Sequence, residues 1–272
     1  TQLTNGQFVN GAQVQNVVGA PIYVPQPYAQ PFGVPQLRGV GAALPFGLEF
    51  FGGTEFDVDG TLIEGKPGGK SFGGGGLAGE IPSISYSDAF SDGYNIGVGG
   101  SYDIGRNTTA FATAEYSQKN GRRVDAGSFQ SGTFDADGNF TPDIGSEEPR
   151  TLTGRFDDLE QYTLEAGVRQ YVGQNPIFRP YVAASGGFAY NNDVDLVQTY
   201  DDNGEVFNEQ EIIDSGWRPT AAALVGAEVA VGNRGAVGIE SGLRWRDNLK
   251  TVGGGADDRL SIPVRLRGRL AF

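Results

Sequence analysis

The chain has 272 residues, a formal net charge of −13 and no histidine, cysteine or methionine. Without cysteine it has neither disulfides nor a thiol nucleophile, and its acidic balance argues against nucleic-acid binding, because phosphate contacts need clustered basic side chains. No apolar run approaches the roughly 18 residues of a membrane helix. Because a translated chain begins with methionine, we expect Thr1 to be the end left by removal of a secretory signal.

Residues 1–45 differ from the rest of the chain and predict an extended N-terminal tail. They contain one charged residue, Arg38, and are rich in Gln, Asn, Gly and Pro. The central segment APIYVPQPYAQPFGVPQL is typical of polyproline-type backbone with apolar side chains interspersed. We expect Tyr23, Tyr28 and Phe32 to dock this tail, either on the folded part of its own chain or on another copy or another envelope protein.

From Phe46 onward, apolar and polar residues alternate with period two, which is the pattern of half-buried strands. The alternating segments number eight: 46–57, 93–104, 107–118, 158–172, 177–191, 215–231, 234–248 and 258–272. Several are longer than the roughly 9–11 residues with which a tilted strand crosses a bilayer.

The connections between these strands alternate in length. Short turns have the sequences DIGRN, VGQNP and VGNRG. The longer polar connections, which we expect to be loops, are 58–92, 119–157, 192–214 and 249–257. Short turns at one end and long loops at the other are typical of a transmembrane barrel.

The final strand, RLSIPVRLRGRLAF, has an apolar face and a charged face. Apolar residues or glycine occupy every second position from Leu260, and Arg265, Arg267 and Arg269 lie between them. A soluble sandwich would bury the apolar face, and the strands alone leave that alternative open. Aromatic residues near strand ends favour a membrane barrel, because such residues form interfacial girdles. They are Tyr94, Tyr102, Tyr116, Tyr162, Tyr171, Trp245 and Phe272.

The charged faces of the predicted strands carry residues of both signs. Both signs are needed if these faces line a narrow lumen, because an unpaired buried arginine costs several kcal/mol. The residues expected to form a lumen network of ion pairs are Glu115, Glu165, Arg169, Arg218, Glu228, Glu240, Arg244, Arg265, Arg267 and Arg269. The sequence therefore favours hydrocarbon outside and ion pairs inside.

The segments YTLEAGVRQYVGQNPIFRPYVAASGGFAY and VRLRGRLAF resemble the small eight-stranded outer-membrane barrels of the OmpA/OmpX type. The resemblance covers residues 46–272 and implies an all-β fold: an eight-stranded antiparallel up-and-down transmembrane β-barrel, here with an extended N-terminal tail. It implies a place in the bacterial outer membrane, both chain ends in the periplasm, and contact with outer-membrane lipid and lipopolysaccharide. It also implies that the strand ending at Phe272 is the signal read by the barrel-assembly machinery.

Enzymes among the small outer-membrane barrels depend on histidine, as a general base or to activate serine or water. This chain has no histidine, so we expect no enzymatic activity and no cofactor. An acid pair such as Glu115 and Glu165 is expected to be structural, because arginines share its face.

Three segments between strands carry a similar phrase: FDVDGT (56–61), FDADGN (134–139) and YDDNGE (200–205). In the second, Asp135, Asp137, Asn139 and Asp143 partly match the spacing of a calcium loop, although its closing glutamate is missing. A hairpin tip is the favoured interpretation, because Asp-Gly and Asn-Gly are typical of such turns.

Residues 193–214 contain eight acidic and no basic residues. Such a segment is expected to be a solvated loop, and bridging by divalent cations is the alternative.

These features predict a structural or assembly role, in which the tail and the long loops make protein contacts in the envelope, in an oligomer or an array. An eight-stranded lumen is just filled by its side chains, so little solute should pass. Two alternatives remain: a narrow pore or carrier for small solutes, and a surface adhesin or receptor acting through 119–157 and 192–214.

Overall fold

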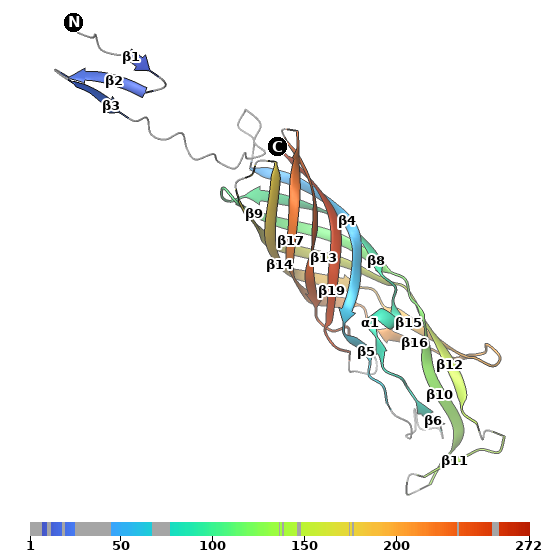
Figure 1. The fold of residues 1–272 in the computed structure, drawn as a ribbon. Coiled ribbons are helices and arrows are strands. Elements are labelled where there is room, and N and C mark those ends of the chain that lie inside the picture. Colours follow the sequence, from blue (N-terminus) through green and yellow to red (C-terminus); the bar gives the residue numbers. More distant parts are fainter. Residues whose placement is uncertain are drawn as a thin grey trace.

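Eight antiparallel strands close into a barrel in a computed structural model of the chain (Figure 1). The structure describes residues 45–66, 77–135, 137, 139–145, 148–173, 175, 177–232, 234–251 and 256–272, and the backbone of 7–9, 12–17 and 20–24. The barrel strands are β4 (Phe46–Asp59), β8 (Gly93–Asp103), β9 (Thr108–Lys119), β13 (Leu159–Tyr171), β14 (Phe178–Asn191), β17 (Gly216–Val231), β18 (Gly235–Arg246) and β19 (Arg259–Ala271). Every predicted strand is present, with each end within two residues of its predicted position. The predicted fold class is confirmed.

Each barrel strand pairs with the strand that precedes it in the barrel, and the last strand, β19, closes the sheet against β4. Closure leaves no unpaired strand edge, which a hydrocarbon environment demands. The three predicted short turns connect β8 to β9, β13 to β14 and β17 to β18. In two of them, Gly173 and Gly232 have φ values of 85° and 64°, a left-handed conformation that glycine adopts without strain.

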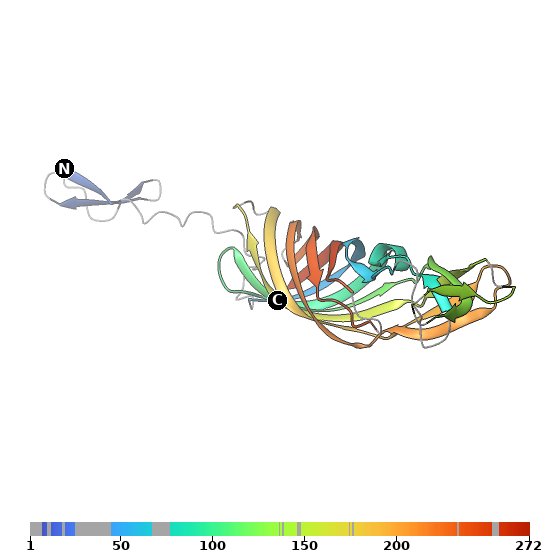
Figure 2. The same ribbon diagram turned by 90° about the horizontal axis from the view of Figure 1, so that it is seen from below.

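Three of the four segments predicted as loops are folded instead, so that prediction is wrong. They supply a second antiparallel sheet, the extramembrane sheet, at one end of the barrel (Figures 1 and 2). Its strands are β6 (Leu77–Glu80), β10 (Arg123–Phe134), β11 (Phe140–Pro142), β12 (Arg150–Phe156), β15 (Val194–Tyr200) and β16 (Val206–Ile213). Acidic residues obscured the alternation: Val194 and Leu196 are buried while Asp195 between them is not. The segment forms a strand because every second residue packs against an apolar core.

An apolar cluster, here called the plug, joins the extramembrane sheet to the barrel. It includes residues of β5 (Thr61–Ile63), β7 (Ile84–Ser85) and the short helix α1 (Tyr86–Ala89). Its members are Leu62, Ile84, Tyr86, Ala89, Phe90, Phe156, Leu159, Val194, Leu196, Ile212, Ile213 and Leu249. The ring of Tyr86 lies 5.7 Å from the guanidinium of Arg259, which belongs to the barrel interior. The plug therefore covers the end of the lumen.

The N-terminal region forms a small antiparallel sheet of β1 (Gln7–Val9), β2 (Ala12–Val17) and β3 (Ala20–Val24). The polyproline-type prediction is therefore wrong for 20–24, where Tyr23 pairs with Val14. Tyr28 and Phe32 lie outside the described residues. In the part of the chain that the structure describes, no helix is long and apolar enough to cross a membrane.

Glycines inside the barrel make room for aromatic rings. Phe51, Phe111 and Tyr181 point into the lumen and are buried. A Cβ atom added to Gly97 would overlap the ring of Phe51, and one added to Gly167 would lie 2.7 Å from the ring of Phe111. The lumen is thus packed to the point where a methyl group on these strands has no space.

We predict that Gly97→Ala lowers the free energy of unfolding by about 1–3 kcal/mol, the usual cost of overpacking. Gly100→Ala, three residues along the same strand, is the matched control, because a Cβ atom there meets nothing within 4 Å. Urea unfolding of both variants in detergent micelles measures the difference. Equal stability of the two variants would contradict this packing.

Candidate functional site

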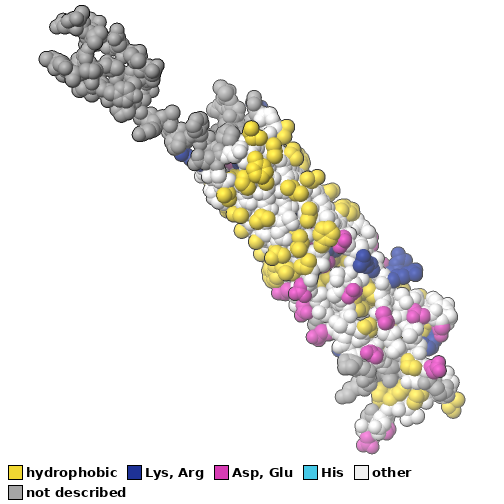
Figure 3. Space-filling view, in the orientation of Figure 1, with side chains coloured by type: hydrophobic (Ala, Val, Ile, Leu, Met, Phe, Trp, Pro, Cys, Tyr) yellow, Lys and Arg dark blue, Asp and Glu magenta, His cyan; other side chains and the backbone are white. Residues whose placement is uncertain are grey.

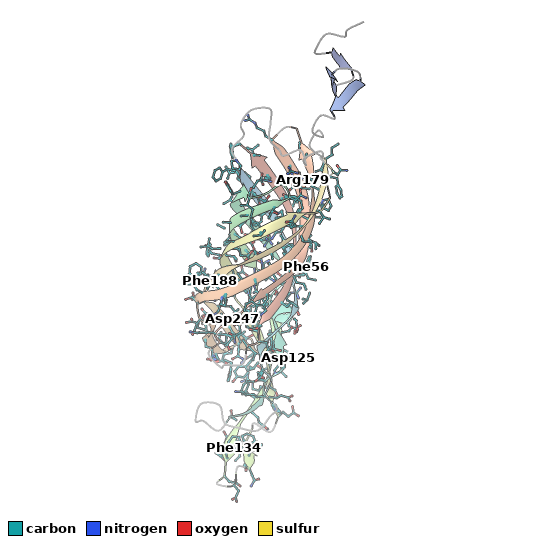
Figure 4. The ribbon with its side chains drawn as sticks, turned by 90° about the vertical axis from the view of Figure 1, so that its left-hand side faces the viewer. Phe56, Asp125, Phe134, Arg179, Phe188 and Asp247 are labelled. Carbon is teal, nitrogen blue, oxygen red and sulfur yellow. The ribbon has the colours of Figure 1, made fainter. Side chains whose placement is uncertain are left out.

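The outer wall of the barrel is apolar, as the alternation predicts. Leu164, Val237 and Leu266 are 53%, 53% and 65% exposed, and hydrophobic side chains cover much of the barrel face seen in Figure 3. Phe56 and Phe188 project outward from this wall (Figure 4). Such a belt is what faces hydrocarbon in a transmembrane barrel.

A row of aromatic residues follows the barrel rim nearest the extramembrane sheet. It comprises Tyr94, Tyr116, Tyr162, Tyr190, Trp217 and Trp245 on six different strands. Neighbouring rings pack across strands in tilted arrangements: ring centroids are 5.3 Å apart for Tyr116 and Tyr162, and 5.5 Å apart for Tyr190 and Trp217. The predicted girdle is present at this rim, with Tyr190 and Trp217 added. Tyr171 is a correction, because it is buried in the lumen, with its ring 3.9 Å from the guanidinium of Arg179.

Arg244 lies at the centre of the half of the lumen nearest the plug. It is fully buried, and its guanidinium nitrogens lie 3.0 Å from Glu55, 2.9 Å from Glu115 and 3.2 Å from Glu165. Arg265 also pairs with Glu115. One guanidinium thus joins carboxylates from β4, β9 and β13 to the opposite wall, β18.

A second group of ion pairs fills the half of the lumen nearest the short turns. Glu49 accepts from Arg169 at 2.9 Å and from Arg267 at 3.1 Å. Glu228 accepts from Arg267 at 2.6 Å and lies 3.3 Å from Arg179. Aromatic rings in the lumen add cation–π contacts to three of the buried arginines. Arg169 lies over Phe111, Arg265 over Phe51 and Arg267 over Tyr181.

Nine of the ten predicted lumen residues take part in ion pairs, among them Glu240 with Arg265 at 3.8 Å and Arg269 with Asp103 at 2.8 Å. The exception is Arg218, which points into the lumen but has no carboxylate partner among the described residues. Ala189, which pairs with Arg218 from β14, and Thr220, two residues further along β17, carry no charge.

The predicted network leaves out other members, which lie mainly on β4 and at the strand ends. They are Glu49, Glu55, Asp57, Asp103, Lys119, Arg179, Arg246 and Arg259. A signal for these residues was present on β4: Glu49, Glu55 and Asp57 all stand at odd-numbered positions and therefore lie on the same face of the strand. The pair Gly52 and Gly53 interrupts the apolar alternation there and hides it.

The segment with partial calcium-loop spacing is the tip of the β10–β11 hairpin, so the hairpin interpretation is confirmed. Phe134 pairs with Phe140. Asp135 accepts hydrogen bonds from the backbone N–H groups of Asp137 and Asn139, at 2.9 and 2.8 Å. Within the described ranges, no three acidic side chains gather closely enough to hold a metal ion. Of the predicted calcium ligands, Asn139 donates a side-chain hydrogen bond to Asp135 at 2.9 Å, while the backbone N–H of Asp143 donates to Ser131 at 2.9 Å. Calcium binding stays a prediction.

The other two phrases of this kind behave differently. YDDNGE forms the tip of the β15–β16 hairpin, with Gly204 at a φ of 69°. FDVDGT is not a hairpin: β4 runs to Asp59, and the chain bends at Gly60, whose φ is 122°.

The extramembrane sheet carries an aromatic cluster on the face that continues from the plug. Phe207 stacks on Phe129 with centroids 5.1 Å apart and meets Tyr200 edge-on at 5.3 Å. The guanidinium of Arg150 lies 3.5 Å above the Tyr200 ring and forms an ion pair with Asp202 at 2.6 Å. Hydrogen bonds from Arg150 hold the pKa of the Asp202 carboxyl below its usual range. Because that pKa is lowered, the pair stabilises this corner at neutral pH and is lost as the pH falls through it.

One closed sheet thus combines an apolar outer wall, a rim of aromatic residues and a lumen filled with ion pairs. The chain is a closed eight-stranded antiparallel β-barrel with the inverted polarity of a transmembrane barrel. No protein-family model matches its sequence, and no curated protein does.

Several solved structures are similar to this chain. Neisserial surface protein A covers 85% of this chain and 100% of its own, at 12% identity and a TM-score of 0.41. OprG from Pseudomonas aeruginosa covers 85% and 98%, at 11% identity and a TM-score of 0.40. The outer membrane protease OmpT from Escherichia coli covers 87% and 100%, at 9% identity and a TM-score of 0.35. At such identities the likeness concerns the fold.

We predict that Arg244→Met lowers the free energy of unfolding by about 3–5 kcal/mol, because it leaves three buried carboxylates without their shared partner. Adding Glu165→Gln to this variant should restore part of the loss, since it removes one uncompensated charge. Urea unfolding in micelles, followed by circular dichroism, measures both. Arg106→Met, at an exposed turn position, is the control, and an Arg244→Met barrel as stable as this control would show that the network is dispensable.

Proposed function

We propose that this protein is a structural contact protein of the outer membrane. The barrel anchors the chain in the membrane, and the extramembrane sheet and the N-terminal tail contact other envelope proteins or further copies of the chain, in an oligomer or an array. The observation that carries this proposal is the combination of a filled lumen with a folded sheet that extends beyond it. A barrel built in this way holds the sheet at a fixed place on the membrane surface.

Transport is less well supported by the geometry. Buried guanidinium and carboxylate groups meet across the lumen, and the plug covers one of its ends with buried apolar side chains. A solute would have to displace several ion pairs at once. Each broken pair leaves charges in a low-dielectric interior, at a cost of several kcal/mol.

We further propose that the chain is not an enzyme. Histidine is absent from the sequence, and general-base or nucleophilic catalysis in barrels of this size relies on it. The carboxylates that could act as an acid–base pair, Glu115 and Glu165, are both engaged by Arg244.

The polar face of the extramembrane sheet is the surface proposed to make contacts. Arg123 on β10 lies directly opposite Arg155 on β12, both are exposed, and neither has an ion-pair partner among the described residues. Like charges placed side by side on a sheet destabilise it. An acidic surface on a partner protein would relieve this repulsion, so the proposed partner carries carboxylates at this position.

We also propose an orientation of the barrel in the membrane. The rim with the extramembrane sheet faces outward, with lipopolysaccharide around the aromatic girdle. The short turns, the N-terminus and Phe272 face the periplasm. The backbone N–H of Phe272 donates to Phe46 at 3.1 Å, so the proposed signal for the barrel-assembly machinery lies at the seam where the first and last strands meet.

Cross-linking on intact cells tests the contact role, because a chain without cysteine accepts a single introduced thiol. We predict that Thr133→Cys, exposed on β10, yields a discrete larger species with a membrane-impermeant thiol–amine cross-linker. Lys250→Cys, exposed on the segment between β18 and β19, is the matched control and should remain mostly monomeric. Mass spectrometry of the band distinguishes another copy from a different protein.

Removing residues 1–44 in the Thr133→Cys background separates the tail from the sheet. A band that persists assigns the contact to the sheet, and a band that disappears assigns it to the tail. Equal, diffuse cross-linking at both cysteine positions would rule out a specific contact surface.

A further inference from the structure

The lumen contains more basic than acidic residues. Its basic residues are Lys119, Arg169, Arg179, Arg218, Arg244, Arg246, Arg259, Arg265, Arg267 and Arg269. Its acidic residues within the described part of the chain are Glu49, Glu55, Asp57, Asp103, Glu115, Glu165, Glu228 and Glu240. Ten cations therefore face eight anions inside a closed sheet.

The surplus lies in the half of the lumen nearest the plug. In the other half, four arginines meet four carboxylates, and every one of the eight takes part in an ion pair. Near the plug, Lys119 pairs with Asp57 at 2.7 Å, and Arg246 pairs with Glu55. Asp57 and Glu55 are thus already paired. Arg218 and Arg259 are left without a close carboxylate partner among the described residues.

Arg218 has no anionic partner among the described residues. It is 8% exposed, and its Nη1 donates a hydrogen bond to the carbonyl of Trp217 at 3.2 Å. Its Nε and Nη2 atoms are buried and have no hydrogen-bond partner in the part of the chain that the structure describes. A buried guanidinium in this state is costly unless something supplies negative charge.

Arg259 is only partly compensated. Its Nη2 donates to Oε1 of Gln161 at 2.5 Å, but its contacts with Asp57 and Glu55 are long, at 3.6 and 3.9 Å. Its Nε and Nη1 atoms are buried without a hydrogen-bond partner. Asp57 lies nearer to Lys119, and Glu55 lies nearer to Arg246, so neither carboxylate is a close partner of Arg259.

The two arginines belong to the same level of the barrel. Across adjacent strands, Gln161 pairs with Asn191, and Asn191 pairs with Gly216. Arg259 reaches this level through Gln161, and the guanidinium of Arg218 lies 3.6–3.8 Å from where a Cβ atom of Gly216 would be. Unsatisfied guanidinium donors from two strands, β17 and β19, therefore lie near the level of Gln161 and Gly216.

We propose that a small inorganic oxyanion of the phosphate class binds here, between Arg218 and Arg259. The planar fork of a guanidinium matches the paired oxygens of such an anion, and charge-assisted hydrogen bonds of this kind are strong. The site lies inside the lumen beneath apolar residues, with side chains 8% and 2% exposed. It fits a free anion and not a lipid headgroup. Bound there, the anion stabilises the junction between the barrel and the extramembrane sheet, whether or not that sheet makes protein contacts.

Thermal unfolding of the full chain in detergent tests this site. At constant ionic strength, with sodium gluconate as the balancing salt, the midpoint of the wild-type protein should rise steadily with the logarithm of phosphate concentration, as linkage requires for a ligand of the native state. Arg218→Gln should lose this dependence. Arg106→Gln, at the exposed turn, should keep it. A parallel series in chloride should raise the midpoint less, and an equal rise in chloride would overturn the assignment to an oxyanion.

A midpoint of the wild-type protein that does not move would overturn the proposal. So would an equal rise in all three proteins, since that pattern marks a general salt effect. If Arg218→Gln does not fold, calorimetric titration of the wild type with phosphate decides, with one site per chain expected and no heat of binding as the contradicting result.

Discussion

The pairing of arginine with glutamate inside a closed eight-stranded sheet is the constraint on which the rest of the structure depends. Hydrocarbon surrounds the outer wall, so every second residue of each strand must be apolar and the charged residues must point inward. Inside, each charge needs a partner because water is scarce and an unpaired ion is costly. Arg244 shows the result: a single side chain joins carboxylates from three other strands. The register of the barrel is fixed because a shift by one residue would move each charge into lipid.

The plug extends this constraint beyond the membrane. It covers the lumen with apolar side chains from α1, β12, β15 and β16, and a drier interior strengthens the ion pairs beneath it. The same residues form the base of the extramembrane sheet. Barrel and sheet therefore support each other: the ion pairs give the plug a rigid floor, and the plug limits the access of water to the ion pairs.

Much of this architecture could be read from the sequence, and the part that could not has a physical reason. The length and number of the alternating segments predicted the barrel. The alternation also predicted that the side chains of Arg265, Arg267 and Arg269 point inward. The partners of these arginines were hidden, because an ion pair such as Arg169 with Glu49 joins residues 120 positions apart. The extramembrane sheet was taken for loops, in part because acidic residues on β15 and β16 obscure the alternation of those strands. Tyr171 was assigned to the girdle from its place at a strand end, although its parity puts it inside.

Contact with lipid hydrocarbon tests the inverted polarity of the fold most directly. Leu266 and Leu224 are both leucines of barrel strands, yet the first lies on the outer wall and the second is buried in the lumen. In bicelles, with leucine methyl groups labelled, the inverted polarity predicts nuclear Overhauser effects from lipid acyl chains to Leu266 and none to Leu224. Acyl-chain contacts at Leu224, or water contacts alone at Leu266, would contradict it.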